Sequence, residues 1–262
     1  MRNLSLILWV LLLMDGVFGV DKVKQVSVSV MKGDSVTLHT DVTELQSDKI
    51  EWMSEDNVII AQIANNKISI DDVSEGRLEL DHQTGSLTIR NITENRIYNL
   101  DIGGRIQISK RFNVTVHDEM KTVSVKKEDS IILRTGVIDI REYYQILWKF
   151  EDERMAEITK GTNKFSLYNS ANGRFSGRLH PDHQTGSLTI SDSQTTDSGD
   201  YHLNMISSSH TIQRTISVTV KGLSSAVIAV IALCVALVVV VAVAVGVAIC
   251  HMQHVKRSRG VV

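Results

Sequence analysis

The feature that most constrains this chain is a nine-residue stretch that occurs twice. Asp81 to Ile89 and Asp182 to Ile190 both read D-H-Q-T-G-S-L-T-I, and a Gly-Arg-Leu triplet lies just upstream of each copy. An internal repeat of this kind indicates one folding unit present in two copies. Within each copy a polar stretch with a glycine separates two short alternating runs, which predicts a β-hairpin. We therefore expect two tandem units of the same fold.

Both ends of the chain carry apolar segments. Residues 1–19 contain Arg2, an apolar run and then small residues up to Gly19, which is typical of a secretory signal peptide rather than a membrane anchor, because the run is too short to span. Residues 223–250 are almost entirely apolar and uncharged, long enough to cross a hydrocarbon core of about 30 Å as a transmembrane helix. The tail, residues 251–262, holds Lys256, Arg257 and Arg259. The positive-inside tendency predicts a single-pass type I plasma-membrane protein with an extracellular N-terminus.

The segment between these ends contains no cysteine. The chain has two, Cys234 and Cys250, and both belong to the predicted membrane segment. Short alternating strands follow one another with polar turns about every 8–12 residues, which predicts all-β sandwiches. An extracellular sandwich of this size is usually stapled by a disulfide. We expect these sandwiches to be held by packing and hydrogen bonds alone.

Several motifs resemble the immunoglobulin variable-type fold. G-D-S-V-T-L precedes a strand in the first unit, a single Trp follows it, and D-S-G-D-Y spans residues 197–201. The resemblance implies two tandem variable-type domains, at residues 20–117 and 118–221. In each, a Trp, a Leu and a Tyr form the structural core: Trp52, Leu100 and Tyr98 in the first domain, and Trp148, Leu203 and Tyr201 in the second.

The same resemblance implies where the missing disulfides would be. The family joins two strands across the sandwich at positions that Thr40 and Leu100 occupy here, and that Thr135 and Leu203 occupy in the second domain. It also implies a structural ion pair between Arg178 and Asp197, with Arg77 and Glu94 as its counterpart, and a tyrosine corner at Tyr98 and Tyr201.

The hairpin pattern R-L-x-x-D-x-Q-T-G-S-L-T-I, with a bridge-free first domain, resembles the signalling lymphocytic activation molecule (SLAM) family of lymphocyte adhesion receptors. Two features depart from that family, which has a disulfide-rich constant-type second domain and, in its signalling members, tyrosine motifs in long tails. The resemblance implies adhesion or immune-cell recognition, by binding a surface protein of the same superfamily, homophilically or heterophilically, through the GFCC′ face of the first domain. The alternative is a receptor for a soluble or pathogen-derived ligand that signals through a separate partner.

Candidate partner-binding residues follow from strand alternation. If Trp52 points into the core, its neighbours point outward, and the same reasoning applies to the two closing strands of the first domain. The outward candidates are Glu51, Met53, Glu55, Asn99, Asp101, Arg105 and Gln107. This mixture of acids, a base and a methionine suits weak, charge-selected contact, although an ordinary solvated face would show the same residues.

Two sequons, at Asn91 and Asn113, predict N-glycosylation. On the resembling fold both face the membrane-proximal half of the first domain. Unless that placement is incidental, sugars there would leave the distal tip and the upper sheet face bare.

Catalytic chemistry has no support in the sequence. The G-x-S-x-G, P-loop and H-E-x-x-H motifs are absent, and a net charge of −2 argues against a nucleic-acid partner. His180, Asp182 and His183 could be imagined as metal ligands, but their polar hairpin favours a solvated turn. We predict a binding protein, not an enzyme, without catalytic residues, metal or cofactor.

Overall fold

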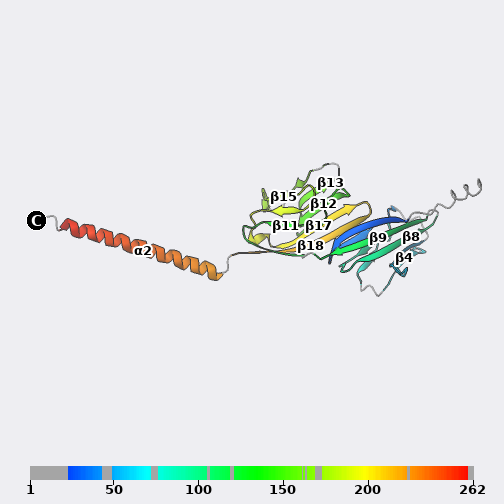
Figure 1. Cartoon of the computed structure of the whole chain (residues 1–262), viewed down its shortest axis with the longest axis horizontal. Coiled ribbons are helices and arrows are strands. Elements are labelled where there is room, and N and C mark those ends of the chain that lie inside the picture. The colour runs from blue at the N-terminus through cyan, green and yellow to red at the C-terminus, as the bar shows by residue number, and fades with distance from the viewer. Residues whose placement is uncertain are drawn as a thin grey trace, which may run out of the picture.

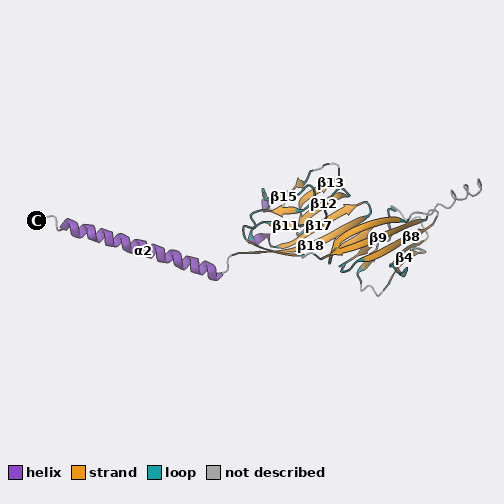
Figure 2. Ribbon diagram, viewed as in Figure 1, coloured by secondary structure: helices purple, strands orange, loops and turns teal. Residues whose placement is uncertain are grey.

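The computed structural model describes residues 23–42, 49–71, 76–104, 107–118, 121–160, 162, 164–168, 173–222 and 225–258. The predicted signal peptide lies outside this part of the chain. Figures 1 and 2 show two β-sandwiches in a row, followed by one long helix. We call the sandwiches the first and the second domain.

The first domain pairs a six-stranded sheet with a three-stranded one. The larger sheet has the order β1 (Lys24–Met31), β9 (Ile108–His117), β8 (Arg96–Gly103), β3 (Lys49–Met53), β4 (Ile59–Ala64) and β5 (Lys67–Ile70). β1 runs parallel to β9 and the other neighbours are antiparallel. The smaller layer has the order β2 (Ser35–Leu38), β7 (Leu87–Ile89) and β6 (Leu78–Leu80).

The second domain repeats this arrangement. One layer has the order β14 (Ser166–Leu167), β13 (Glu153–Thr159), β12 (Tyr143–Phe150), β17 (Gly199–Ser207) and β18 (His210–Lys221), with β10 (Thr122–Lys126) parallel to the lower half of β18. The other layer has the order β11 (Ile131–Leu133), β16 (Leu188–Ile190) and β15 (Leu179–Pro181), and a 3-10 turn, η3 (Thr195–Asp197), precedes β17. The prediction of two all-β sandwiches without an inter-sheet disulfide is confirmed.

The repeated hairpin binds the core tryptophan of its own domain. Trp52 Nε1 donates to the carbonyl oxygen of Gly85 at 2.8 Å, and Trp148 Nε1 donates to that of Gly186 at 2.9 Å. Both indoles are fully buried, where an unpaired N–H would carry a desolvation cost of about 1–3 kcal/mol. The repeated sequence therefore supplies, in each domain, the carbonyl oxygen that accepts the hydrogen bond from the buried indole N–H.

Threonine at the position of the missing cystine contacts the same turn. Thr40 Oγ1 donates to the carbonyl oxygen of Thr84 at 2.6 Å, and Thr135 Oγ1 donates to that of Thr185 at 2.5 Å. These carbonyls immediately precede the ones that accept from the tryptophans. Each domain thus replaces a covalent cross-link with two hydrogen bonds from its interior to one turn.

The glycine of the repeat is required by its conformation and its surroundings. Gly85 and Gly186 have φ of +67° and +71°, in the left-handed region that glycine tolerates best. A Cβ on Gly85 would lie 2.3 Å from Ile50 Cδ1, and one on Gly186 would lie 2.9 Å from Ile146 Cδ1. The turn therefore packs its backbone directly onto an isoleucine of the facing sheet.

Apolar side chains occupy the space that a cystine would take. Leu100 and Leu203 are fully buried opposite Trp52 and Trp148 on neighbouring strands. In the first domain Phe112 packs against Trp52 with ring centroids 5.5 Å apart. These contacts supply apolar burial worth about 25 cal/mol per Å² in place of the bridge.

The base of the second domain contains the ion pair that the resemblance implies. Arg178 Nη1 and Nη2 lie 2.7 and 3.0 Å from the two carboxylate oxygens of Asp197, and hydrogen bonding to this carboxylate raises the pKa of Arg178. The Tyr201 hydroxyl donates to the carbonyl oxygen of Asp197 at 2.7 Å. Burial raises the pKa of Tyr201, so this hydroxyl stays a donor.

The first domain lacks the counterpart of that pair. Glu94 forms its ion pair with Arg96 instead of Arg77, and Arg77 Nε is buried without a hydrogen-bond partner among the described residues. Tyr98 is buried at the tyrosine-corner position. The expectation of an Arg77–Glu94 pair is therefore wrong, because Glu94 pairs with Arg96, which lies only two residues away in the sequence.

The two domains share one sheet. The upper half of β18 pairs antiparallel with β2 of the first domain over four residues on each strand, from Leu38 opposite His210 to Ser35 opposite Gln213. β1 is paired with β9 and leaves the edge of β2 open, and an open edge presents unpaired backbone groups. The second domain closes this edge and extends the sheet without interruption from β14 to β6.

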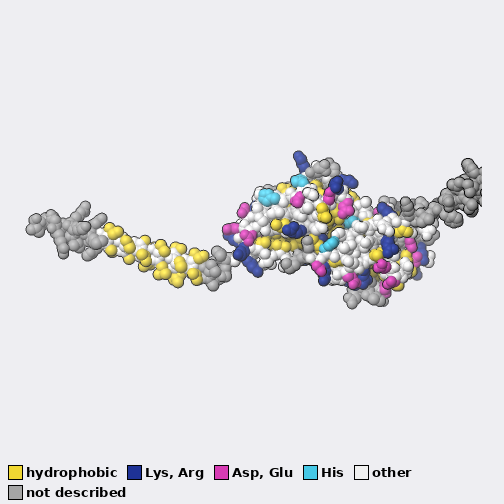
Figure 3. Space-filling model, viewed as in Figure 1, with side chains coloured by type: hydrophobic (Ala, Val, Ile, Leu, Met, Phe, Trp, Pro, Cys, Tyr) yellow, Lys and Arg dark blue, Asp and Glu magenta, His cyan; other side chains and the backbone are white. Residues whose placement is uncertain are grey.

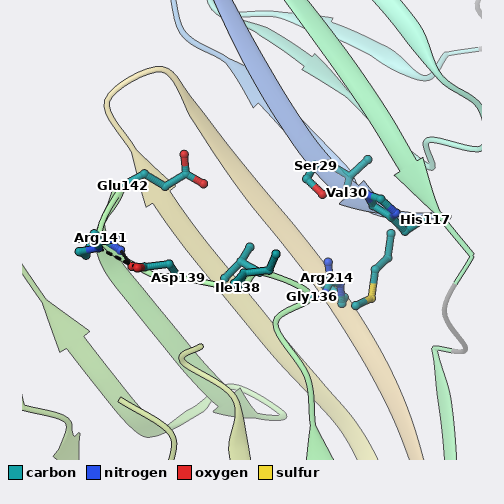
Figure 4. A pocket seen from close by; sticks show the side chains of 11 residues that line it. Ser29, Val30, His117, Gly136, Ile138, Asp139, Arg141, Glu142 and Arg214 are labelled. Carbon is teal, nitrogen blue, oxygen red and sulfur yellow. Dashed lines mark hydrogen bonds and ion pairs between the residues drawn. The ribbon is translucent and has the colours of Figure 1, made fainter. Parts of the chain in front are cut away.

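A buried ion pair lies beneath this shared sheet. Arg214 on β18 and Asp34 before β2 have side chains that are 1% and 0% exposed, with Nη2 to Oδ2 at 2.8 Å. Arg214 Nη1 also donates to the carbonyl oxygens of Arg134 and Thr135, while Lys121 Nζ lies 3.3 Å from Asp34 Oδ1. Arg214 is one of the residues that line a cleft of about 790 Å³ between β1 and the loop before β12, and Figure 4 shows it beside Gly136.

The helix α2 (Ser225–Ser258) follows the second domain. Its segment Ala229–Ile249 spans 21 residues with a mean hydropathy of 3.3 and is not buried against the rest of the protein. Figure 3 shows hydrophobic side chains, in yellow, over the described surface of this helix. By length and composition this helix can cross a membrane.

Candidate functional site

The candidate site is the outward face of the six-stranded sheet in the first domain. Trp52 on β3 and Leu100 on β8 point into the core. Their neighbours along each strand point outward. Glu51 lies opposite Asp101 and Met53 lies opposite Asn99 across the β3–β8 pair. The structure thus brings these four predicted residues together as a partly exposed patch.

Polar contacts hold this patch in place. Lys49 Nζ lies 2.8 Å from Glu51 Oε1, and the Ser109 hydroxyl donates to Asp101 Oδ1 at 2.7 Å. Asn99 Nδ2 donates to the carbonyl oxygen of Ser54 at 3.3 Å. Like charges on directly opposite residues destabilise a sheet, so the lysine and the hydroxyl offset the repulsion between the two acids.

Two predicted residues lie beyond the ends of their strands. Glu55 belongs to a turn after β3, with Oε1 3.9 Å from Arg111 Nη2. Gln107 is exposed and immediately precedes β9, which begins at Ile108. The expectation that both lie within strands is wrong, because a turn follows β3 and β9 begins only at Ile108. Arg105 lies outside the described residues.

The sequence reasoning missed other residues of the same face. Ser109 and Arg111 on β9 lie opposite Asp101 and Asn99, and Gln62 on β4 lies opposite Glu51. The signal was present, because 109 and 111 have the same alternation as the predicted Gln107. The prediction placed the start of this strand too early and selected residues 105 and 107 from it. It therefore omitted Ser109, which contacts Asp101, and Arg111, which contacts Glu55.

The two sequons occupy different surroundings. Asn113 is exposed on β9 between the buried Phe112 and Val114, on the outward face of the six-stranded sheet. Four residues of extended strand, about 13 Å, separate it from Ser109. Asn91 is exposed at the corner after β7 with φ of +50°. A sugar on Asn113 would therefore restrict the lower part of the candidate face and leave the Glu51–Asp101 patch free.

A buried lysine closes the sandwich behind this face. Lys110 points inward from β9 with its side chain 3% exposed, and its Nζ lies 2.6 Å from Asp41 Oδ2 and 2.7 Å from the carbonyl oxygen of Thr40. Burial lowers the pKa of Lys110. This charge belongs to the interior and does not add to the charge of the outward face.

The polar residues of the repeated hairpin serve the turn itself. Asp182 Oδ1 accepts from the backbone N–H of Gln184 at 2.8 Å, which lowers the pKa of Asp182. His180 Nε2 lies 3.2 Å from Ser191 Oγ. These contacts give His180 and Asp182 a structural role within the hairpin.

Comparison with known proteins agrees with this geometry. Residues 119–221 match the family model of the immunoglobulin V-set domain. The match shows that the second domain is an immunoglobulin V-set domain, as the sequence predicted, and the first domain has a similar two-layer strand arrangement. No curated protein matches the chain by sequence.

Three solved structures are among those similar to this chain, each at low identity and low TM-score. CD84 of the SLAM family is 19% identical with a TM-score of 0.35, over 40% of this chain and 100% of that chain. Murine CEACAM1b is 18% identical with a TM-score of 0.30, over 74% of this chain and 96% of that one. The CD2-binding domain of CD58 is 13% identical with a TM-score of 0.31, over 75% and 97%.

Proposed function

We propose that this chain is a single-pass type I surface protein that acts in cell adhesion or immune-cell recognition. Its first domain binds a surface protein of the same superfamily through the outward face of the six-stranded sheet. The observation that carries the proposal is the Glu51–Asp101 patch, which lies on the domain farther along the molecule from α2 (Figure 1). The V-set match and the apolar helix support the class of protein.

The chemistry of the patch suits a weak and selective contact. Two acids lie opposite each other, with Lys49 beside one and Arg111 on the neighbouring strand. Charges at the rim of an interface act mainly on partner choice and association rate. We expect a partner with basic side chains opposite Glu51 and Asp101, so reversal of these charges should prevent binding.

The test compares two charge-reversal variants on cells. Glu51→Lys with Asp101→Lys reverses the patch, while Glu79→Lys with Glu94→Lys makes the same charge change elsewhere on the first domain, where both acids are exposed. Cells that display the wild-type chain are mixed with each other and with lymphocytes, and aggregation is counted. The first variant should lose aggregation while the control retains it, with equal surface display of both.

The same assay separates the alternatives. Clustering of expressing cells alone indicates homophilic binding, and clustering only with other cells indicates a heterophilic partner. If the patch variant aggregates as well as the wild type, the proposed face is wrong. If no cell type binds while a soluble ligand does, the chain is a receptor of the alternative kind.

A further inference from the structure

A polar groove lies where the shared sheet crosses from one domain to the other. Its volume is about 370 Å³, within the range of about 300–1,000 Å³ that is typical of small-ligand pockets. Leu147, Asn204, Gln213 and Ser35 form one row across β12, β17, β18 and β2. Thr215, Lys149 and Lys121 also line the groove. The lining is rich in amide, hydroxyl and ammonium groups, together with the apolar side chains of Leu147 and Leu203.

Asn91 lies next to Gly33, one of the residues that line this groove. The corner after β7 is held to the turn before β2, because Gly33 N donates to the carbonyl oxygen of Ile92 and Ile92 N donates to that of Asp34. A Cβ on Gly33 would lie 3.1 Å from Lys121 Nζ and 3.4 Å from Asn91 Oδ1. Gly33 and Lys121 both line the groove. The side-chain oxygen of Asn91 therefore lies beside Gly33, a residue that lines the groove, and Asn91 itself is exposed.

We propose that an N-linked glycan on Asn91 lies in this groove and bridges the two domains. The inference rests on the proposed function, since a surface protein passes through the compartment where sequons are modified. There Asn91 Nδ2 loses a proton and bonds to the anomeric carbon of the first N-acetylglucosamine, displacing the pyrophosphate of a lipid-linked oligosaccharide. The glycan that results is the occupant of the groove.

The groove offers the groups that a sugar needs. Hydroxyl and acetamide groups of the glycan exchange hydrogen bonds with Gln213, Thr215 and Lys149, and the ring covers Leu147. The side-chain oxygen of Asn204 is buried in this region without a hydrogen-bond partner among the described residues, and a small rotation of its amide lets it accept from the sugar. Contacts to Lys121 and Ser35 join the first and second domains through the same glycan.

The second sequon provides a contrast within the same domain. Asn113 lies in the middle of an exposed sheet face, opposite Ser27 on β1. A glycan on Asn113 projects into solvent, so it serves as a matched internal control for the one on Asn91.

The experiment measures release of each glycan from the native full-length chain, expressed on mammalian cells and solubilised in mild detergent. A peptide N-glycosidase is added, and glycopeptide mass spectrometry follows both sites with time. The Asn91 glycan should be released at least about tenfold more slowly than the Asn113 glycan, a ratio equivalent to ~1.4 kcal/mol of protection. Gln213→Ala keeps both sequons and should bring the Asn91 rate close to that of Asn113.

A second readout reports the bridge itself. Thr93→Ala removes the Asn91 sequon and keeps the asparagine, while Asn113→Gln removes the other glycan. Thermal unfolding should shift downward in the first variant and stay unchanged in the second. Equal release rates at the two occupied sites, or an Asn91 left unmodified while Asn113 is modified, would overturn the inference and leave the proposed function standing. A chain displayed without a glycan at either site would overturn the secretory placement on which both rest.

Discussion

Replacing Arg214 by Met should destabilise both domains at once. The guanidinium contacts Asp34 of the first domain through Nε at 3.0 Å and Nη2 at 2.8 Å, and it donates to two backbone carbonyls of the second domain. Breaking one side of a buried ion pair costs about 3–5 kcal/mol, because the other charge stays buried without its partner. Lys121 near Asp34 keeps the ion-pair part at the low end, and the two carbonyls add about 1 kcal/mol between them. We expect a total loss of about 4 kcal/mol.

The assay is urea unfolding of residues 20–222, followed by NMR of the two indole N–H groups. Trp52 and Trp148 are the only tryptophans in this part of the chain, so each domain has one probe. In the wild type both signals should disappear in one transition, because the shared sheet couples the domains. In Arg214→Met both midpoints should fall. Asp34→Asn combined with Arg214→Met should regain about 1–2 kcal/mol, since the only charge then left without its partner, that of Lys121, is partly exposed.

Arg178→Met is the control, because it breaks a largely buried Arg–Asp pair, with side chains 16% and 0% exposed, within the second domain alone. Because it leaves the junction intact, that variant should lower the midpoints of Trp52 and Trp148 together. If Arg214→Met lowers the free energy of unfolding by less than ~1 kcal/mol, the value typical of an exposed pair, then the junction does not hold the domains together as argued. The same conclusion follows if Arg214→Met affects only Trp148.

Two further predictions concern the glycine of the repeated turn and the stability of the protein at acidic pH. Gly85→Ala should cost several kcal/mol more than Gly76→Ala by chemical denaturation, because both have similar positive φ but only Gly85 has a side-chain carbon 2.3 Å from the added Cβ; equal costs of about 1 kcal/mol would mean that strain alone decides. Burial lowers the pKa of His210 to about 4, below the ~6.5 of an exposed histidine. The unfolded chain therefore binds the proton first as pH falls, and about 3 kcal/mol should be lost between roughly pH 6.5 and 4. His210→Gln should flatten that part of the stability profile, and an unchanged profile would contradict the assignment.

The sequence was informative about each sandwich and silent about their junction. The repeat and the alternation around Trp52 and Trp148 predict the fold because they are local patterns that either domain displays by itself. The role of Thr40 and Thr135 in binding the repeated turn required the structure, since a hydroxyl gives no periodic signal. For the candidate face, alternation identified the correct side of each strand, but turn geometry placed Glu55 and Gln107 beyond the strand ends.

The junction depends on residues that are far apart in the sequence. Asp34 and Arg214 are separated by 180 positions, and in a single sequence neither stands out from the other charged residues. The pairing of β2 with β18 likewise depends on an absence, namely that β1 pairs with β9 and leaves one edge of β2 open. Such an edge is recognised only when the whole sheet order is known.

The hydrogen bonds to the repeated turn and the contacts at the junction together explain how these sandwiches hold together without disulfides. A bridge closing a loop of about 60 residues would stabilise each domain by roughly 4 kcal/mol, and hydrogen bonds from Thr40 and Trp52 replace only part of this. The shared sheet supplies further stability by closing the edge of β2 and burying Asp34 against Arg214. Because that same contact fixes the first domain on the second, it also fixes the direction in which the Glu51–Asp101 patch faces. Stability and presentation of the candidate face therefore depend on the same few contacts at the junction.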